Sequence, residues 1–438
     1  MTETARSQPG VSFAVIMSAW HDPAARILNI DLVTVLIAIL LPWSTTGVVI
    51  AAVLWVVALV PTLEVGAFLR SLKRPICLLP IAMFALALAG TLWSEAPWGE
   101  RLYAVGPTVK LLMLPLLLYH CERSPRGVWV FTAFLVSCML LMAASWVADF
   151  NPDLSLKAYF SRGPYLAVNG IFVKNYIDQG QEFTLCAVAL AYPIVALLRA
   201  KRIWPAALLG AVALSLLVNM MFVVISRTAL VTMPIMLAVF ALLHLKWRTV
   251  VIVLCVATVF AGLAWAASSQ LRRTTETLLR DYQLYKERNI PTSIGLRLEF
   301  WQKSLRFFSE APIFGHGTGS IRGLFEEAAV DQFGAAAEVV GNPHNQTLNV
   351  AIQWGLTGIA VLYAMWALHL LLFRGDGLAA WIGLLVVVQN IFTSLFNSHL
   401  FDFHEGWMYV LGVGVAGGMV LKTASRDAAL EPRNSVEP

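Results

Sequence analysis

The chain has 438 residues, of which 58% are hydrophobic and 13% are charged, and its mean hydropathy is +0.72. Soluble domains carry about 25% charged residues, so these values exclude a soluble globular protein and place the chain in a lipid bilayer. The net charge of +5 does not indicate nucleic-acid binding, because the basic residues are divided between two membrane faces and form no groove motif with aromatic residues.

Runs of roughly 17–25 apolar residues are long enough to cross a bilayer as helices, and the sequence contains about twelve of them. They predict an all-α polytopic membrane protein. Residues 1–26 are too polar to span, so we expect a cytoplasmic N-terminus that leads into an uncleaved first helix. The predicted helices lie near residues 27–44, 46–61, 75–92, 104–120, 127–149, 181–199, 204–224, 228–245, 248–268, 346–373, 378–397 and 404–421.

Lysine and arginine are concentrated in alternate connections between these runs. The positive-inside rule places those connections in the cytoplasm, so residues 422–438 are expected to form a cytoplasmic tail. The segments 150–180 and 269–345 then lie on the outer face, where long loops are translocated largely regardless of their charge. The cysteines fall within apolar runs or at an inner helix end, so no outer loop offers a disulfide.

The segment 269–345 divides the membrane part into residues 27–268 and 346–421, between the predicted ninth and tenth helices. The chain is therefore asymmetric, whereas many secondary transporters consist of two inverted halves with matching interrupted helices. A membrane transporter is the class of protein that this asymmetry disfavours. It should carry charge along a pore, whereas the candidate charges of this chain gather at one membrane face.

An apolar stripe within segment 269–345 predicts an amphipathic helix. Its members recur at steps of four, three, four and three residues, as helical periodicity requires, and they are Ile294, Leu298, Trp301, Leu305 and Phe308. Such a helix should lie in the membrane interface or pack on the bundle. Lys303 and Arg306 fall on its opposite face, which we expect to be solvated. Arg297 borders the stripe, so it should be partly buried, and no acidic residue stands four positions away to pair with it.

Four further cations stand at or near the outer membrane surface. Arg227 interrupts an apolar run, and Ser226 before it can cap the following helix. A charge inside an apolar run is a candidate functional group, although Arg227 or Lys110 could instead extend its charged end to the membrane surface. Lys174 and Arg162 lie in the outer segment 150–180 and are weaker candidates.

The stretch Gly341-Asn342-Pro343-His344-Asn345 precedes an apolar run and places one histidine at the outer membrane surface. Asn342 can cap a helix that has Pro343 in its first position, which places His344 in the first turn. The positive end of the helix dipole favours a neutral imidazole there, and also a nearby anion. Two interpretations remain open from spacing alone: His344 is a general base, or it is a histidine that only caps the helix.

The other motifs argue against metals and nucleotides. The sequence contains no Asp-x-Asp pair, Walker loop or zinc spacing, so we expect no metal and no cofactor. The glycines of Gly315-His316-Gly317-Thr318-Gly319 follow no strand, so they predict a tight loop and no dinucleotide site. His399, Asp402, His404 and Glu405 cluster in the last outer loop, but their spacing favours helix ends or contacts to an acceptor over a metal site.

Three short motifs occur in a fixed order along the chain. They are Ser226-Arg227, then Gly295-Leu296-Arg297-x-x-x-Trp301 with Pro312-x-x-Gly315-x-Gly317-x-Gly319 after it, and His344-Asn345 followed by Gly355-Leu356-Thr357-Gly358. In these motifs and in its helix layout, the whole chain resembles bacterial O-antigen ligases. The same motifs recur in O-antigen polymerases and protein O-oligosaccharyltransferases, so they identify the superfamily better than the acceptor.

The resemblance implies a fold of about twelve transmembrane helices with one large helical periplasmic loop, as in GT-C-like glycosyltransferases. It implies a transferase in the bacterial inner membrane that moves polysaccharide from undecaprenyl diphosphate to a sugar hydroxyl of lipid A-core. His344 would then be the catalytic base, Arg227 and Arg297 would bind the diphosphate, and the other cations would assist. Asn345, Ser226, Trp301, Gly355 and Gly358 would be supporting residues of the motifs.

A transporter or flippase of lipid-linked glycans is the alternative outside the enzymes. Within the enzymes, the alternative is a polymerase or a protein O-oligosaccharyltransferase of the same superfamily. Polymerases tend to have two substantial outer loops, whereas here segment 150–180 is modest and segment 269–345 dominates. A protein-glycosylating enzyme would usually be longer at its C-terminus. Both comparisons favour a ligase, whose donor and acceptor are lipid-linked and whose site lies on the periplasmic side.

Overall fold

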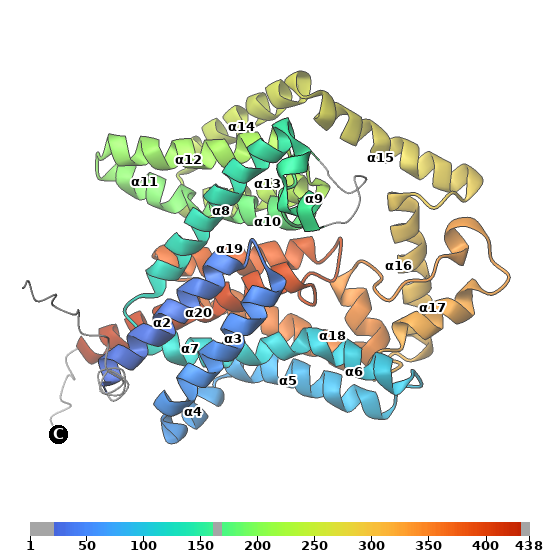
Figure 1. The fold of residues 1–438 in the computed structure, drawn as a ribbon, viewed down its shortest axis with the longest axis horizontal. Coiled ribbons are helices and arrows are strands. Elements are labelled where there is room, and N and C mark those ends of the chain that lie inside the picture. The colour runs from blue at the N-terminus through green and yellow to red at the C-terminus, as the bar shows by residue number, and fades with distance from the viewer. Residues whose placement is uncertain (1–21, 161–168, 431–438) are drawn as a thin grey trace, which may run out of the picture.

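The computed structural model describes residues 22–160 and 169–430, and these residues form helices and connecting loops without any strand. The prediction of an all-α polytopic membrane protein is therefore confirmed (Figure 1). Arg162 lies outside the described residues. The first nine membrane helices and their neighbours are α2 Pro23–Leu40, α3 Thr45–Leu59, α4 Val65–Leu72, α5 Pro75–Ala89, α6 Trp98–Val109, α7 Met113–Arg123, α8 Gly127–Phe150, α9 Leu156–Phe160, α10 Tyr176–Ala189, α11 Ala191–Arg199, α12 Ile203–Phe222, α13 Arg227–His244 and α14 Trp247–Ala267.

The remaining helices are α15 Ser269–Arg288, α16 Ser293–Glu310, α17 Ile321–Ala329, α18 Gln346–Leu372, α19 Leu378–Thr393 and α20 Phe403–Leu430. Over the described residues, 10 helical stretches are long and apolar enough to cross a membrane, and α19 is a shorter apolar helix. The 18-residue α2 packs against α3 and α8. With α2 and α19 included, helices overlap all of the predicted apolar runs.

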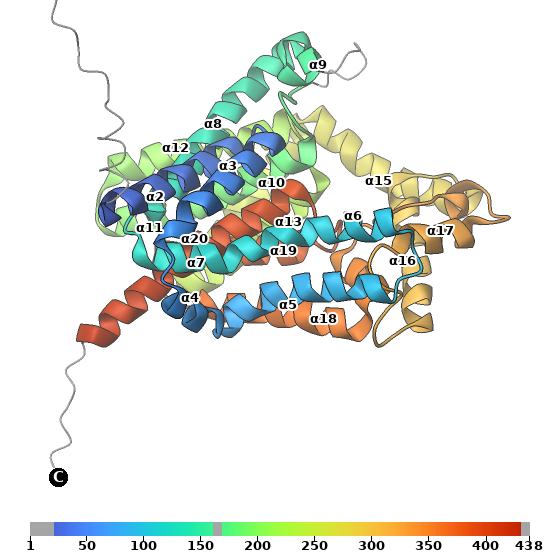
Figure 2. The same ribbon diagram turned by 60° about the horizontal axis from the view of Figure 1, so that its bottom comes forward.

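Four helices run side by side and give the bundle two distinct ends: α20 packs along α7, and α18 along α5. At one end, the backbone N–H of Thr318 donates to the carbonyl of Gly90, just after α5 (3.0 Å). At the other end, the His369 ring contacts the carbonyl of Ile76 (3.1 Å). Helices α15, α16 and α17 lie beyond the first end, whereas α4 and the last turns of α20 lie at the second (Figures 1 and 2).

Helix α16 packs through the face opposite to its apolar stripe. Phe300 and Phe307 are buried, and both rings contact Phe325 of α17 edge-on at centroid distances of 5.6 and 5.3 Å. Leu298 and Leu305 of the stripe stay exposed. The stripe is thus available to lipid or to a ligand.

The expectation that Lys303 lies on a solvated face is wrong. Its side chain is buried, and its ammonium donates to the carbonyl of Ala336 and lies 3.9 Å from Glu299. The physical reason is that α17 and the 3-10 turn Gly334–Ala337 cover this face of α16. Arg306, one turn later, is exposed as expected, with 61% of its side-chain surface accessible.

Helix α18 is broken at Gly355, whose φ of 60° and ψ of −151° interrupt the helical backbone. The loop that follows α16 docks on this break. Leu356 N–H donates to the Pro312 carbonyl (2.8 Å), and Gly317 N–H donates to the Gln353 carbonyl (2.9 Å). A Cβ at Gly355 would lie 2.5 Å from the carbonyl of Ile313, so the glycine is required twice, by backbone conformation and by space. This contact joins segment 269–345 to the bundle.

We therefore expect Gly355→Ala to destabilise the protein by about 1–3 kcal/mol, because an alanine is strained at this positive φ and its methyl group would clash with Ile313. The measurement is the thermal unfolding midpoint of the purified protein in detergent. Gly323→Ala in α17 is the matched control, since a Cβ there meets nothing within 4 Å. Equal midpoints for the two variants would contradict the role of Gly355.

Candidate functional site

A cavity of about 730 Å³ opens between α16, the start of α13 and the residues around the start of α10. Its walls are mostly apolar, and Arg227 and Arg297 are the two cations among its lining residues. Ser226 caps α13, since its hydroxyl accepts from the N–H of Ala229 (3.4 Å), and this cap sets Arg227 at the helix start. Trp301, one turn after Arg297, lines the same cavity.

The two arginines are incompletely paired within the described residues. Arg297 bonds only to Ser293, and its Nε is buried without a partner, as is the indole Nε1 of Trp301. Arg227 contacts Thr277 (3.4 Å) and lies 3.7 Å from a carboxylate oxygen of Asp281. Burial, followed by repulsion from Arg227, lowers the pKa of Arg297. Two cations that repel each other beside unused donors form a site suited to an anion.

The structure corrects the placement of His344. Helix α18 begins at Gln346 and is capped by Asn345, whose side chain accepts from Leu348 N–H (3.1 Å). His344 therefore precedes the helix and does not occupy its first turn. Its φ is 53°, in the left-handed region, and its N–H donates to Asn342 Oδ1 (3.0 Å). A residue other than glycine carries backbone strain in this conformation, and such strain is often found at functional sites.

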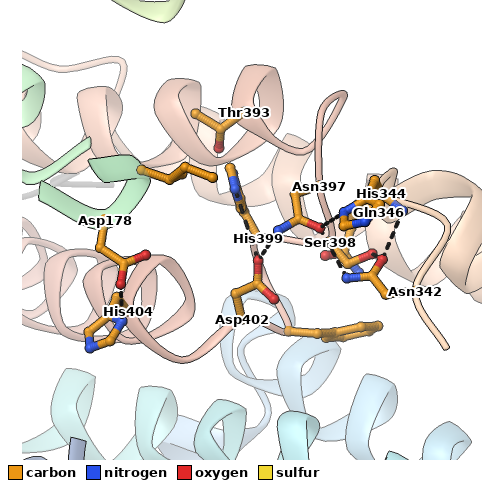
Figure 3. Close-up of polar contacts among 12 residues, drawn as sticks. Asp178, Asn342, His344, Gln346, Thr393, Asn397, Ser398, His399, Asp402 and His404 are labelled. Carbon is orange, nitrogen blue, oxygen red and sulfur yellow. Dashed lines mark hydrogen bonds and ion pairs between the residues drawn. The ribbon is translucent and has the colours of Figure 1, made fainter. Parts of the chain in front are cut away.

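A hydrogen-bond network fixes the imidazole of His344 (Figure 3). Its Nδ1 lies 2.9 Å from Asn397 Oδ1, and the amide Nδ2 of Asn397 donates to Asp402 Oδ2. Because Asn397 presents its oxygen to the ring, Nδ1 must carry the proton, which leaves Nε2 unprotonated in the neutral ring. The ring also stacks on Phe300 of α16 at a centroid distance of 6.1 Å. The geometry gives His344 a defined tautomer with a free basic nitrogen.

The electrostatics keep this ring neutral. Burial is the main cause that lowers the pKa of His344; the hydrogen bond to Asn397 opposes it, and the charge of Arg297 lowers the pKa further. The sequence had suggested the helix dipole as the cause. The charge of Arg297 thus acts on the histidine, although His344 is not among the residues that line the cavity.

The other candidate cations lie elsewhere. Lys110 is buried and donates to the carbonyls of Phe401 (3.0 Å) and Asp402, so it holds the loop that carries Asn397. Lys174 donates to the carbonyl of Leu41 and lies 3.8 Å from Glu182. Neither lysine lines the cavity. The charged ends of both lysines are thus engaged within the protein.

Asn397 and Asp402 complete the hydrogen-bond network of His344, and no role for Asn397 was predicted from the sequence. Asn397 follows α19 by four residues and belongs to no motif. Its position could have indicated a role, because it is a polar residue at a predicted outer helix end, in the same loop as His399 and Asp402. Asp402 binds Asn397, while His399 lies 4.0 Å from Asp402 and His404 lies 2.8 Å from Asp178 (Figure 3). No group of three metal-ligating side chains converges among the residues described.

The family model for O-antigen ligase matches residues 217–363. This segment runs from the end of α12 into α18 and contains Arg227, Arg297 and His344. The match covers about a third of the chain and supports its relation to the O-antigen ligase and polymerase superfamily. Members of this superfamily are glycosyltransferase-like ligases and polymerases. Lys110 and Lys174 lie outside the matched segment.

A protein of Haemophilus influenzae, described as uncharacterized, is 26% identical to this chain over 168 residues. The match covers 37% of this chain and 42% of the relative. The chain thus spans less than half of the length of this relative, and the similarity carries no information on substrates.

The lowered pKa of His344 predicts the pH dependence of the family reaction. A base must be unprotonated, so kcat/KM should stay high at neutral pH and fall only as the pH drops through a value below the 6.5 of an ordinary histidine. Arg297→Gln removes a charge that lowers this pKa, so the acid limb of the profile should move to higher pH. The measurement is kcat/KM for a lipid-linked donor against pH. An unshifted acid limb in Arg297→Gln would show that another group titrates.

Proposed function

We propose that this chain is an O-antigen ligase that transfers polysaccharide from undecaprenyl diphosphate to a sugar hydroxyl of lipid A-core in the periplasmic leaflet. The observation that carries the proposal is the combination of a tautomer-fixed His344 with an electrostatically linked arginine cavity. The base fits a hydroxyl acceptor, and the arginines fit a diphosphate. A lipid-linked donor supplies the diphosphate as leaving group, so no nucleotide is needed.

In the proposed reaction, Nε2 of His344 removes the proton from the acceptor hydroxyl as its oxygen attacks the anomeric carbon of the donor. The bond between that carbon and the phosphate oxygen breaks, and its electron pair remains on the diphosphate. Arg227 and Arg297 stabilise this growing charge, as fixed cations do in phosphate-releasing sites. Direct displacement inverts the anomeric centre, and undecaprenyl diphosphate leaves.

The walls of the cavity support a polyprenyl donor. Apolar residues from α13 and α16 line it beside the two arginines, among them Val231 and Ile294. Leu298 joins the cavity to the exposed stripe of α16, where Leu305 has 58% of its surface accessible. A lipid phosphate can therefore reach the arginines while its chain stays on apolar surface. We propose that segment 269–345 lies on the periplasmic side and that both chain termini are cytoplasmic.

The test is transfer in proteoliposomes that contain the lipid-linked donor and purified lipid A-core. A ligase links polymer to core, and activity should persist in EDTA because the arginines supply the positive charge. Longer chains on the carrier without core would identify a polymerase, and transfer to an acceptor protein would identify a protein O-oligosaccharyltransferase. Loss of all activity in EDTA would overturn the metal-independent mechanism. A deletion strain should likewise accumulate polymer on the carrier lipid and make core without polymer.

A further inference from the structure

A second cavity lies at the end of the bundle opposite to His344. It has a volume of about 680 Å³ and is formed by the end of α4, the start of α5, the end of α7 and the last turns of α20. The His369–Ile76 contact marks the same end. Helix α18, which is broken at Gly355, starts beside His344 and reaches His369 near its other end, and its 27 residues are enough for a membrane-spanning segment. The second cavity therefore lies at the opposite end of the spanning helices from His344.

The lining of this cavity is strongly cationic. Its charged residues are Arg70, Arg74, Glu122, Arg123, Lys422 and Arg426. Glu122 is the single acid among them, and it is engaged by a two-bond contact with the Arg74 guanidinium (2.8 and 3.0 Å). The other cations have no acidic partner among the described residues. Four positive charges therefore lie on one concave surface without a neutralising acid. A bound anion would reduce the electrostatic repulsion among them.

Two of the cations are held in place by the fold. The guanidinium of Arg123 stacks on the Tyr119 ring at 3.6 Å and donates to the Tyr119 carbonyl (2.9 Å). The ammonium of Lys422 donates to the carbonyl of Arg123 (3.3 Å), which ties α20 to α7. Arg70 and Arg426 also line the cavity, and both side chains are exposed. The cavity thus combines a fixed pair of cations with two adaptable ones.

The surroundings indicate that the anion belongs to a lipid. Helix α4 carries Val65 and Leu69 with 68% and 54% of their surface exposed, next to Arg70 on the cavity. Its other side is packed, since the Phe68 ring contacts Tyr119 edge-on at 5.3 Å. A short helix with exposed apolar side chains beside a basic pocket is suited to the boundary between headgroups and acyl chains. A soluble anion would have no use for the apolar surface.

We propose that this cavity binds the phosphate headgroup of an anionic phospholipid in the leaflet opposite to the transferase site. A headgroup with two phosphates fits the four uncompensated charges best, and its acyl chains would lie along the exposed face of α4. The bound lipid would hold α4, α7 and α20 together at their common end. This site is independent of the proposed transferase reaction.

The test is lipid retention by the purified full-length protein, measured by native mass spectrometry during titration with cardiolipin or phosphatidylcholine. Wild-type protein should retain cardiolipin in preference to phosphatidylcholine, and inorganic phosphate should not displace it. Since each basic residue near a headgroup contributes about a factor of five, Arg70→Gln/Arg426→Gln should weaken retention by about 30-fold. Both side chains are exposed, so the fold should survive.

The matched control is Arg202→Gln/Lys246→Gln, which removes two exposed charges from connections at the same end of the bundle but outside the cavity. It should retain cardiolipin as the wild type does. Equal losses in the two double variants, or equal retention of both lipids, would overturn the site. Displacement of cardiolipin by inorganic phosphate would show a site for soluble anions instead. Should the first double variant unfold, Lys422→Gln serves in its place and must itself weaken retention.

Discussion

Replacing His344 should abolish polysaccharide transfer while leaving the protein folded. General-base catalysis contributes about 10²- to 10⁴-fold to a rate, so His344→Ala should lower kcat by at least the smaller factor. The reason is specific to one atom: Asn397 occupies Nδ1, and only Nε2 remains to accept the proton of the acceptor hydroxyl. The measurement is transfer to lipid A-core in proteoliposomes at saturating donor.

The left-handed backbone at His344 demands a second variant, because alanine is strained at a φ of 53°. Asparagine tolerates this region, so His344→Asn should preserve the turn and the unfolding midpoint while it lacks a basic nitrogen. His316→Ala is the control: its ring contacts the Phe307 carbonyl (2.8 Å) and does not line the cavity. Near-normal transfer by His344→Asn would rule out His344 as the base.

The sequence predicted the membrane helices well because the evidence for them is local. An apolar run of about 20 residues has few alternatives to a helix in a bilayer, where the backbone must satisfy its own hydrogen bonds. The glycines of the motifs were also visible, but their partners were not. Gly355 needs a positive φ because the loop around Ile313 docks against it, and these residues lie far apart in the chain.

The turn around His344 shows where local reasoning fails. Both Asn342 and Asn345 can cap a helix, and Pro343 suits a first helical position, so spacing favoured the earlier start. In the structure, Asn342 instead bonds across to Ser398 and Asn397 of the next loop (2.7 and 3.0 Å). Because these tertiary hydrogen bonds occupy the side chain of Asn342, the helix is capped by Asn345 instead. The identity of Asn397 as the partner of the histidine was not accessible for the same reason.

Lys303 and Lys110 show the corresponding limit for charges. Periodicity assigned Lys303 to a polar face, but α17 and the Gly334–Ala337 turn cover that face and supply a carbonyl for its ammonium. Lys110 stood in an apolar run and was a candidate for phosphate. The loop after α19 folds over it and takes its hydrogen bonds. The hydrogen-bond partners of these buried cations are backbone carbonyls far away in the sequence, so a local sequence pattern cannot predict them.

Arg297 and Arg227 are the two cations that line the cavity beside α16, and their replacement should impair donor use. Removing one fixed donor to a developing negative charge costs about 10²- to 10³-fold in rate, so Arg297→Ala should lose at least that in kcat/KM for the donor. Arg227→Ala should lose less, since Asp281 and Thr277 already engage its guanidinium. The measurement is kcat/KM with the lipid-linked donor varied and lipid A-core held saturating.

Arg306→Ala is the matched control, because Arg306 belongs to the same helix as Arg297 but is exposed and pairs with Glu310 (3.4 Å). It should stay close to the wild type, whereas Lys303 is buried and is not a clean control. Arg297→Lys separates charge from geometry: lysine restores the cation but not the planar fork, so its activity should fall between those of Arg297→Ala and the wild type. Equal losses in Arg297→Ala and Arg306→Ala would mean that α16 contributes only a diffuse positive field. The unpartnered Nε of Arg297 would then have no role in binding the diphosphate.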